Sequence, residues 1–133
     1  MSKVLVVEDE PIIGLQLQES IEAMGYEVPV VIDSGDEVLA AVLKYKPDLI
    51  LMDINLRSFI DGMDAAKRVK LVCDIPVIFL TADPSQASQD RAVGTSPAAY
   101  LVKPISDKIL GEHIGRALAQ PEAPTVRGGE APE

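Results

Sequence analysis

Residues 4–11 have the sequence VLVVEDEP, in which four consecutive apolar residues are followed at once by three acids and a proline. A short run that is apolar at every position is typical of a parallel strand that helices cover on both faces. Similar runs recur four more times along the chain, at Val28 to Ile32, Leu49 to Met52, Val77 to Leu80 and Ala98 to Val102. We therefore expect five buried strands.

Segments of helical periodicity separate these runs. The first carries an apolar stripe formed by Ile13, Leu17, Ile21 and Met24. Pro11 suits its first turn, and Gly25 suits the position just after its end. Four further helices are expected: one opened by a capping box at Ser34 and Glu37, one over Gly62 to about Val72, one over Pro84 to Val93, and one capped by Ser106. Leu43 and Ile109 are expected to face inward from the second and fifth helices.

Strand and helix alternate five times, which predicts an α/β fold with a parallel sheet, right-handed crossovers and helices on both faces. From residue 120 the composition changes to mostly Pro, Gly, Glu and Ala, which bury too little apolar surface to order a chain. We therefore expect one domain over residues 1–119, and a flexible tail or linker remnant over residues 120–133.

The overall charge narrows the classes of partner. Twelve basic and twenty-one acidic side chains give a net charge of −9, which would repel nucleic acid and anionic lipid. Cys73 is the only cysteine, so no internal disulfide can form and a reducing compartment is indicated. No apolar run reaches the roughly 20 residues of a membrane span, and the N-terminus does not resemble a signal peptide. We expect a cytoplasmic protein with neither a nucleic-acid nor a membrane partner.

Reactive side chains follow four of the five predicted strands. Glu8 and Asp9 follow the first, Asp53 the third, Thr81 the fourth and Lys103 the fifth. In an open α/β sheet the carboxyl ends of the strands share one edge, where ligands bind. We therefore expect three carboxylates, a hydroxyl and an amine to converge there.

These side chains together indicate phosphoryl chemistry. Crowded carboxylates repel one another unless a cation lies among them, and Mg²⁺ prefers one or two carboxylates together with phosphate oxygens. A carboxylate beside such an ion can attack a phosphoryl group, while Lys103 and Thr81 contact the remaining oxygens. Each residue taken singly could be a helix cap or a turn residue. Four such coincidences at one sheet edge favour a site, and transient aspartyl phosphorylation is the reaction that it predicts.

The stretches at residues 4–11, 49–54, 79–82 and 100–104 together resemble the receiver domain of two-component response regulators, in particular the single-domain chemotaxis type. The resemblance covers about residues 3–118. It implies the flavodoxin-like receiver fold, a five-stranded parallel sheet in the order 2-1-3-4-5 flanked by five helices.

The resemblance also implies roles for individual residues. Asp53 would be the phosphoacceptor. Glu8, Asp9, Asp53 and the backbone carbonyl of Asn55 would hold Mg²⁺, with Glu8 acting chiefly through water. Lys103 would pair first with Asp53 and then with the phosphoryl group.

A conformational switch is implied as well. Thr81 would move toward the phosphoryl oxygens and so let the ring of Tyr100 turn inward. The Lys103–Pro104 peptide bond would be cis, a form that costs little only before proline. One departure from the family pattern is Arg57, which stands where many receivers have proline.

The favoured function is a stand-alone receiver that accepts a phosphoryl group from a histidine kinase or a histidine phosphotransfer protein. It would signal to an unknown downstream protein by contact or by phosphorelay, with no enzymatic activity beyond its own phosphorylation and dephosphorylation. One alternative is a phosphatase of the haloacid dehalogenase type. That family places its nucleophile on the first strand and an acid two residues later, whereas here the third strand is used and Asn55 follows. A receiver-like interaction domain that is never phosphorylated is the other alternative.

Overall fold

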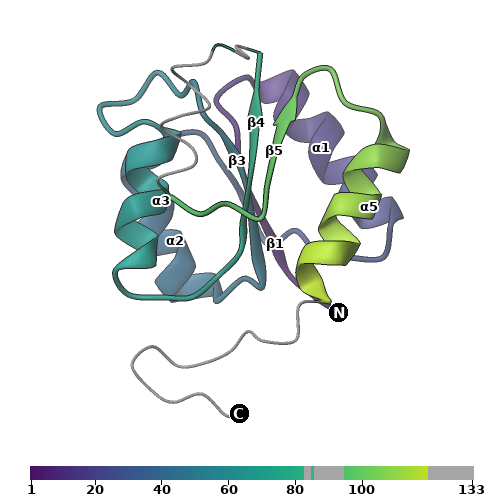
Figure 1. The fold of residues 1–133 in the computed structure, drawn as a ribbon, viewed down its shortest axis with the longest axis horizontal. Helices are drawn as coiled ribbons and strands as arrows, with labels where there is room; N and C mark the ends of the chain where they lie inside the picture. The colour runs from purple at the N-terminus through teal and green to yellow at the C-terminus, as the bar shows by residue number, and fades with distance from the viewer. Residues whose placement is uncertain (83–84, 86–94, 120–133) are drawn as a thin grey trace.

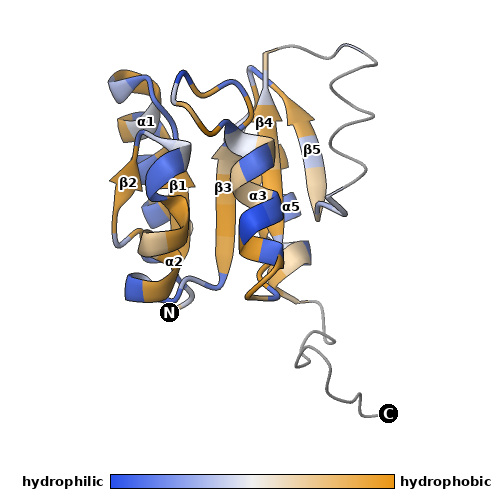
Figure 2. Ribbon diagram, turned by 90° about the vertical axis from the view of Figure 1, so that its left-hand side faces the viewer, coloured by the Kyte–Doolittle hydropathy of each residue, from blue (hydrophilic) through white to orange (hydrophobic). Residues whose placement is uncertain are grey.

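Five parallel strands form one sheet at the centre of the molecule. The structure is a computed structural model, and it describes residues 1–82, 85 and 95–119. The strands are β1 (Val4–Val7), β2 (Val31–Ile32), β3 (Leu49–Asp53), β4 (Val77–Thr81) and β5 (Ala99–Val102). Their order is β2-β1-β3-β4-β5 and every pairing is parallel, as predicted (Figure 2).

Four α-helices connect the strands in the described part of the chain. They are α1 (Pro11–Ala23), α2 (Val38–Tyr45), α3 (Gly62–Lys70) and α5 (Asp107–Leu118). A short 3₁₀ turn, η1 (Gly35–Glu37), precedes α2. The fourth helix predicted over Pro84 to Val93 falls, except for Ser85, outside the described residues.

The helices form two layers around the sheet. Helices α1 and α5 cover one face, and α2 and α3 cover the other (Figure 1). Side chains alternate along β1, because successive residues of a strand point to opposite faces. Leu5 and Val7 belong to the core beneath α2 and α3, whereas Val4 and Val6 belong to the core beneath α1 and α5. Burial on both faces explains why the strand sequences are apolar up to their last residues.

The ends of the helices follow the sequence signals with one shift. Gly25 has a φ of +101°, the left-handed conformation expected of a glycine after a helix. Ser106 caps α5 by accepting a hydrogen bond from the Ile109 N–H at 3.2 Å. Ser34 also acts as a cap, but its hydroxyl accepts from Asp36 at 3.0 Å and begins the 3₁₀ turn rather than α2.

Two residues predicted to face inward are exposed. Leu43 is 58% exposed and Ile109 is 40% exposed, whereas Val38 and Ile114 on the same helices are buried. Each exposed residue lies five positions from its buried partner. Five residues turn an α-helix by about 500°, which leaves the two side chains about 140° apart. They cannot share a face, so these two predictions were wrong.

Two glycines let the loop after β3 lie close to its neighbours. A Cβ atom on Gly62 would collide with the carbonyl oxygen of Asp53, and one on Gly35 would collide with that of Ile60. The first approach packs the start of α3 against the end of β3. The second joins η1 to the loop between β3 and α3, so this loop is held at the edge where the candidate site lies.

Candidate functional site

Three carboxylates meet at the carboxyl edge of the sheet. Glu8 and Asp9 directly follow β1, and Asp53 is the last residue of β3. One carboxylate oxygen of each lies within 4.8 Å of those of the other two. Asp9 and Asp53 are 44 positions apart in the chain, and the pairing of β1 with β3 brings them together. The three acids therefore converge as the sequence predicts.

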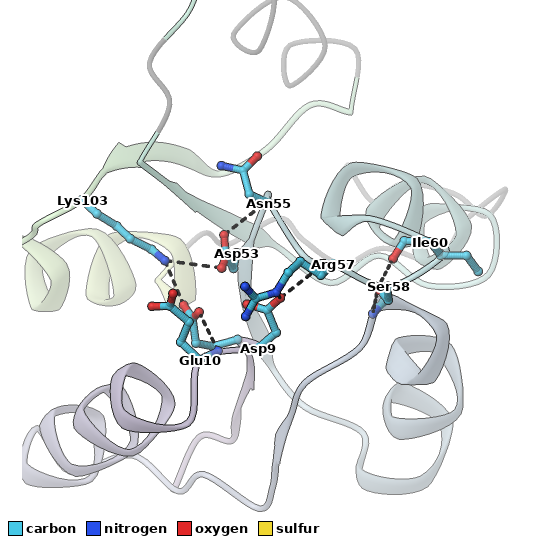
Figure 3. Close-up of polar contacts among 10 residues, drawn as sticks. Asp9, Glu10, Asp53, Asn55, Arg57, Ser58, Ile60 and Lys103 are labelled. Carbon is cyan, nitrogen blue, oxygen red and sulfur yellow. Dashed lines mark hydrogen bonds and ion pairs between the residues drawn. The ribbon is translucent and has the colours of Figure 1, made fainter.

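The Asp53 carboxylate is buried and held at both oxygens. Its residue is only 5% exposed. The Asn55 N–H donates to Oδ1 at 2.9 Å, and the Lys103 ammonium lies 3.4 Å from Oδ2 (Figure 3). These contacts fix the orientation of the carboxylate and place a positive charge beside one of its oxygens.

Lys103 lies even closer to Glu8 than to Asp53. Its Nζ atom is 3.0 Å from Glu8 Oε1, and the Glu10 N–H donates to Glu8 Oε2 at 3.2 Å. Burial raises the pKa of Glu8 to about 7, because the bond from Lys103 only partly offsets desolvation and Asp53 adds repulsion. For Lys103, burial lowers the pKa, but the bonds to both acids outweigh it and the net shift is upward. Lys103 is therefore cationic at neutral pH.

Thr81 contacts Asn55, the residue whose N–H donates to Asp53. Thr81 is the last residue of β4 and is fully buried. Its Oγ1 accepts a hydrogen bond from the Asn55 side-chain amide at 3.2 Å. Sequence reasoning placed both residues at the site, but it did not predict this contact, which depends on the backbone path after β3.

Tyr100 lies away from the carboxylates. It is on β5, in register with Phe79, whereas Thr81 is in register with Val102. The residue is half-buried and packs against the core beneath α2 and α3. Lys103 follows the same strand, and its peptide bond with Pro104 is cis.

Arg57 is a site residue that sequence reasoning noticed but gave no role. Its backbone N–H donates to Asp9 Oδ2 at 2.9 Å, and its Nε lies 3.3 Å from the same oxygen (Figure 3). Its position four residues after Asp53 places it in a loop, but that loop's approach to the end of β1 is a property of the tertiary structure.

A cavity of about 240 Å³ opens at this edge, lined among others by Asp9, Asp53, Asn55, Arg57 and Lys103. A water molecule takes up about 30 Å³ in the liquid, so the cavity has room for an ion with several waters or for a phosphoryl group. Carboxylate oxygens are the ligands that hard divalent cations prefer. The donor set of the acidic cluster therefore fits such an ion.

The fold is an α/β fold with a parallel sheet in the order β2-β1-β3-β4-β5. The carboxyl ends of its strands carry three clustered acids, a lysine and a buried threonine. These features define the class of protein. The model of the response regulator receiver domain family matches residues 4–115 of the chain. The match covers most of the chain, and the protein belongs to this family.

Individual relatives agree with the family assignment. The transcriptional regulatory protein PdtaR of Mycobacterium tuberculosis is 34% identical over 128 residues, which cover 96% of this chain and 62% of PdtaR. The signal receiver domain of a modulated diguanylate cyclase from Desulfovibrio desulfuricans is 33% identical, with a TM-score of 0.83 over 89% of this chain and 94% of that one. The BeF3-activated N-terminal receiver domain of Klebsiella pneumoniae RstA is 26% identical, with a TM-score of 0.84 over 90% and 100% of the two chains.

The chain thus spans less than two thirds of the length of PdtaR. The name transcriptional regulatory protein describes the whole of PdtaR. None of the helices in the described residues has the length and apolar character needed to cross a membrane.

Proposed function

We propose that this receiver domain accepts a phosphoryl group on Asp53 from a phosphohistidine of a kinase or phosphotransfer protein, in a Mg²⁺-dependent reaction. The observation that carries the proposal is the setting of the Asp53 carboxylate. It lines a cavity between the Lys103 ammonium and the Asn55 N–H, with two further carboxylates beside it.

The geometry favours Asp53 over its two acidic neighbours as acceptor. Glu8 has a side chain with no exposed surface, and it is not among the residues that line the cavity. Asp9 is paired with Arg57 through the guanidinium and the backbone. Asp53 lies at the end of the central strand β3 and borders the cavity, so an incoming phosphorus atom can reach it.

Phosphoryl transfer from the donor histidine to Asp53 needs neither an oxidant nor a reductant. An Asp53 oxygen attacks the phosphorus while the bond from phosphorus to the donor nitrogen breaks. The donor ring, which carries a proton on its other nitrogen before the transfer, leaves as neutral imidazole. The product is an aspartyl phosphate, and water later releases inorganic phosphate and restores the carboxylate. Lys103 offers positive charge to the phosphoryl oxygens, and a bound Mg²⁺ would supply further charge neutralisation. Glu8, Asp9 and Asp53, with the Asn55 carbonyl, are the residues that would hold it.

We further propose that Thr81 and Tyr100 transmit the change. The Thr81 hydroxyl is already inside the site, where it accepts from Asn55. A phosphoryl group on Asp53 would offer it a stronger, charged acceptor. Movement of Thr81 on β4 would alter the packing beside β5, where the half-buried ring of Tyr100 lies. A change at this edge would reshape the surface offered to a downstream protein.

The relatives support a regulatory role rather than an independent catalyst. PdtaR is named as a regulatory protein. The haloacid dehalogenase alternative would require its nucleophile on the first strand, whereas the Asp53 carboxylate ends β3. Cytoplasmic location, and the absence of a nucleic-acid partner for this segment of net charge −9, stay predictions.

Incubation with acetyl phosphate and Mg²⁺, followed by intact mass measurement and fragment mapping, tests the proposal. The wild type should gain one phosphoryl group, mapped to Asp53, and Asp53→Asn should gain none. Asp48→Asn is the matched control, because Asp48 is an exposed acid at the opposite edge of the sheet. Undiminished labelling of Asp53→Asn would contradict the assignment. A wild type that binds Mg²⁺ but never gains the group would indicate the unphosphorylated interaction domain instead.

A further inference from the structure

Arg57 contacts Asp9 at the edge of the acidic cluster, and the proposed reaction gives this contact no role. Two of its donors, the backbone N–H and the guanidinium Nε, converge on the single oxygen Asp9 Oδ2. The Arg57 side chain is 76% exposed, whereas that of Asp9 is 12% exposed. The guanidinium is therefore free to leave through solvent, while the carboxylate that it neutralises stays in the site.

The loop that carries Arg57 is tied down just beyond it. The Ser58 hydroxyl accepts from the Gly35 N–H at 2.9 Å and donates to the Ile60 carbonyl at 2.6 Å. The Ile60 N–H donates to Asp36 Oδ1 at 3.1 Å. These bonds anchor the loop to η1, so the Arg57 backbone stays beside Asp9 and only its side chain needs to move.

The charge balance shows what the guanidinium does. With every group ionised, Glu8, Asp9 and Asp53 carry three negative charges, and Lys103 cancels one of them. Arg57 cancels a second, which leaves a net charge of −1 instead of −2. A divalent cation is held by the net negative charge around it, so a fixed positive charge at the rim weakens its binding.

We propose that Arg57 is a positioning residue that neutralises Asp9 while the cluster holds no divalent cation, and that it thereby lowers the affinity of the site for Mg²⁺. The inference rests on the proposed function, because it takes the acidic cluster to be a Mg²⁺ site. In such a receiver the concentration of Mg²⁺ needed for phosphorylation is set partly by a residue that touches neither the phosphoryl group nor the acceptor.

Titration of the full chain with MgCl₂ by calorimetry tests this inference. Arg57→Ala removes the guanidinium but keeps the backbone N–H on Asp9, and it should bind Mg²⁺ about two- to fivefold more tightly than the wild type. Arg57→Lys keeps the charge and should stay within about twofold of the wild type. Arg68→Ala removes the same charge from an exposed position in the last turn of α3, and it should match the wild type.

Ionic strength provides a readout that a purely structural role would not move. The gap between the wild type and Arg57→Ala should shrink as NaCl approaches about 1 M, where charges are screened within about 3 Å. A structural role would make Arg57→Ala bind more weakly, because a loosened loop would disorder Asp9.

The outcomes separate this inference from the function on which it rests. Equal or weaker Mg²⁺ binding by Arg57→Ala, or equal tightening in Arg57→Lys, would overturn the inference while the metal site itself stands. No Mg²⁺ binding by any of the variants would overturn the proposed metal requirement and the inference with it.

Discussion

The stability of the metal-free protein should fall as the pH rises through the range in which Glu8 loses its proton. Burial raises the pKa of Glu8 from 4.5 to about 7 in the folded chain. Between these values the folded state holds a proton on Glu8 that the unfolded state has released. The folded state therefore binds more protons, and the free energy of unfolding decreases with increasing pH in this window. Below pH 4.5 the carboxyl is neutral in both states, and above about 7 it is charged in both.

The expected size of the effect follows from the shift. One pKa unit corresponds to about 1.4 kcal/mol, so a rise from 4.5 to about 7 corresponds to about 3 kcal/mol. The Glu8 side chain has no exposed surface, so solvent does little to screen this cost. An effect of about 3 kcal/mol is a substantial part of the 5 to 15 kcal/mol that is typical of the stability of a folded domain.

Urea unfolding of the wild type and Glu8→Gln in EDTA, at several pH values from about 5 to about 8, measures it. Glutamine keeps the shape of the protonated acid and cannot ionise. Relative to Glu8→Gln, the wild type should lose about 2 to 3 kcal/mol across this range, while the titrations of groups away from this site cancel in the difference. Mg²⁺ favours the charged carboxylates and should reduce that loss by mass action on the folded state.

Parallel stability curves for the two proteins across this range would refute the reasoning. They would show that Glu8 ionises in the folded chain as readily as in water. A wild type that gains stability relative to Glu8→Gln as the pH rises would refute it more strongly, because the pairing with Lys103 would then outweigh burial.

Three further substitutions test contacts at the carboxyl edge of the sheet. Lys103→Met leaves the carboxylates without their ammonium and should slow phosphorylation by acetyl phosphate at least about tenfold, measured as the rate of mass gain; an unchanged rate would remove Lys103 from the chemistry. Asn55→Ala loses the bond to Thr81, worth about 1 kcal/mol, and should alter the lifetime of the phosphorylated protein about fivefold in a phosphate-release assay, whereas an unaltered lifetime would argue against this role. Gly62→Ala forces a Cβ into the carbonyl oxygen of Asp53 and should destabilise the protein by about 1 to 3 kcal/mol in urea unfolding; wild-type stability would show that the loop can yield.

Much of the architecture could be predicted because strand burial leaves a strong trace in the sequence. Every residue of β1, β3 and β4 is buried, so these strands appear as apolar runs, which on β3 and β4 end in Asp53 and Thr81. The edge strands were harder to delimit. Only the last two residues of the apolar run from Val28 to Ile32 form β2. The run from Ala98 to Val102 begins one residue before β5. Edge strands pair on one side only, so apolar character and pairing coincide less well there.

The helix faces show where a periodic pattern fails. Leu43 and Ile109 are apolar residues on amphipathic helices, yet both are exposed, because the helix rotation is set by packing of the neighbouring turns on the sheet. Apolar residues are common on protein surfaces, so composition alone does not reveal which of them point inward.

The sequence by itself determined the alternation of strands and helices and which side chains end each strand. Those facts bring Glu8, Asp9 and Asp53 to one edge, because parallel strands align their carboxyl ends. Only the tertiary structure decided which side chains of the site contact one another. Lys103 lies nearer to Glu8 than to Asp53, and Arg57 contacts Asp9. Such contacts depend on the paths of loops and on the charges of distant segments. Neither leaves a periodic pattern in the sequence from which the contacts could be predicted.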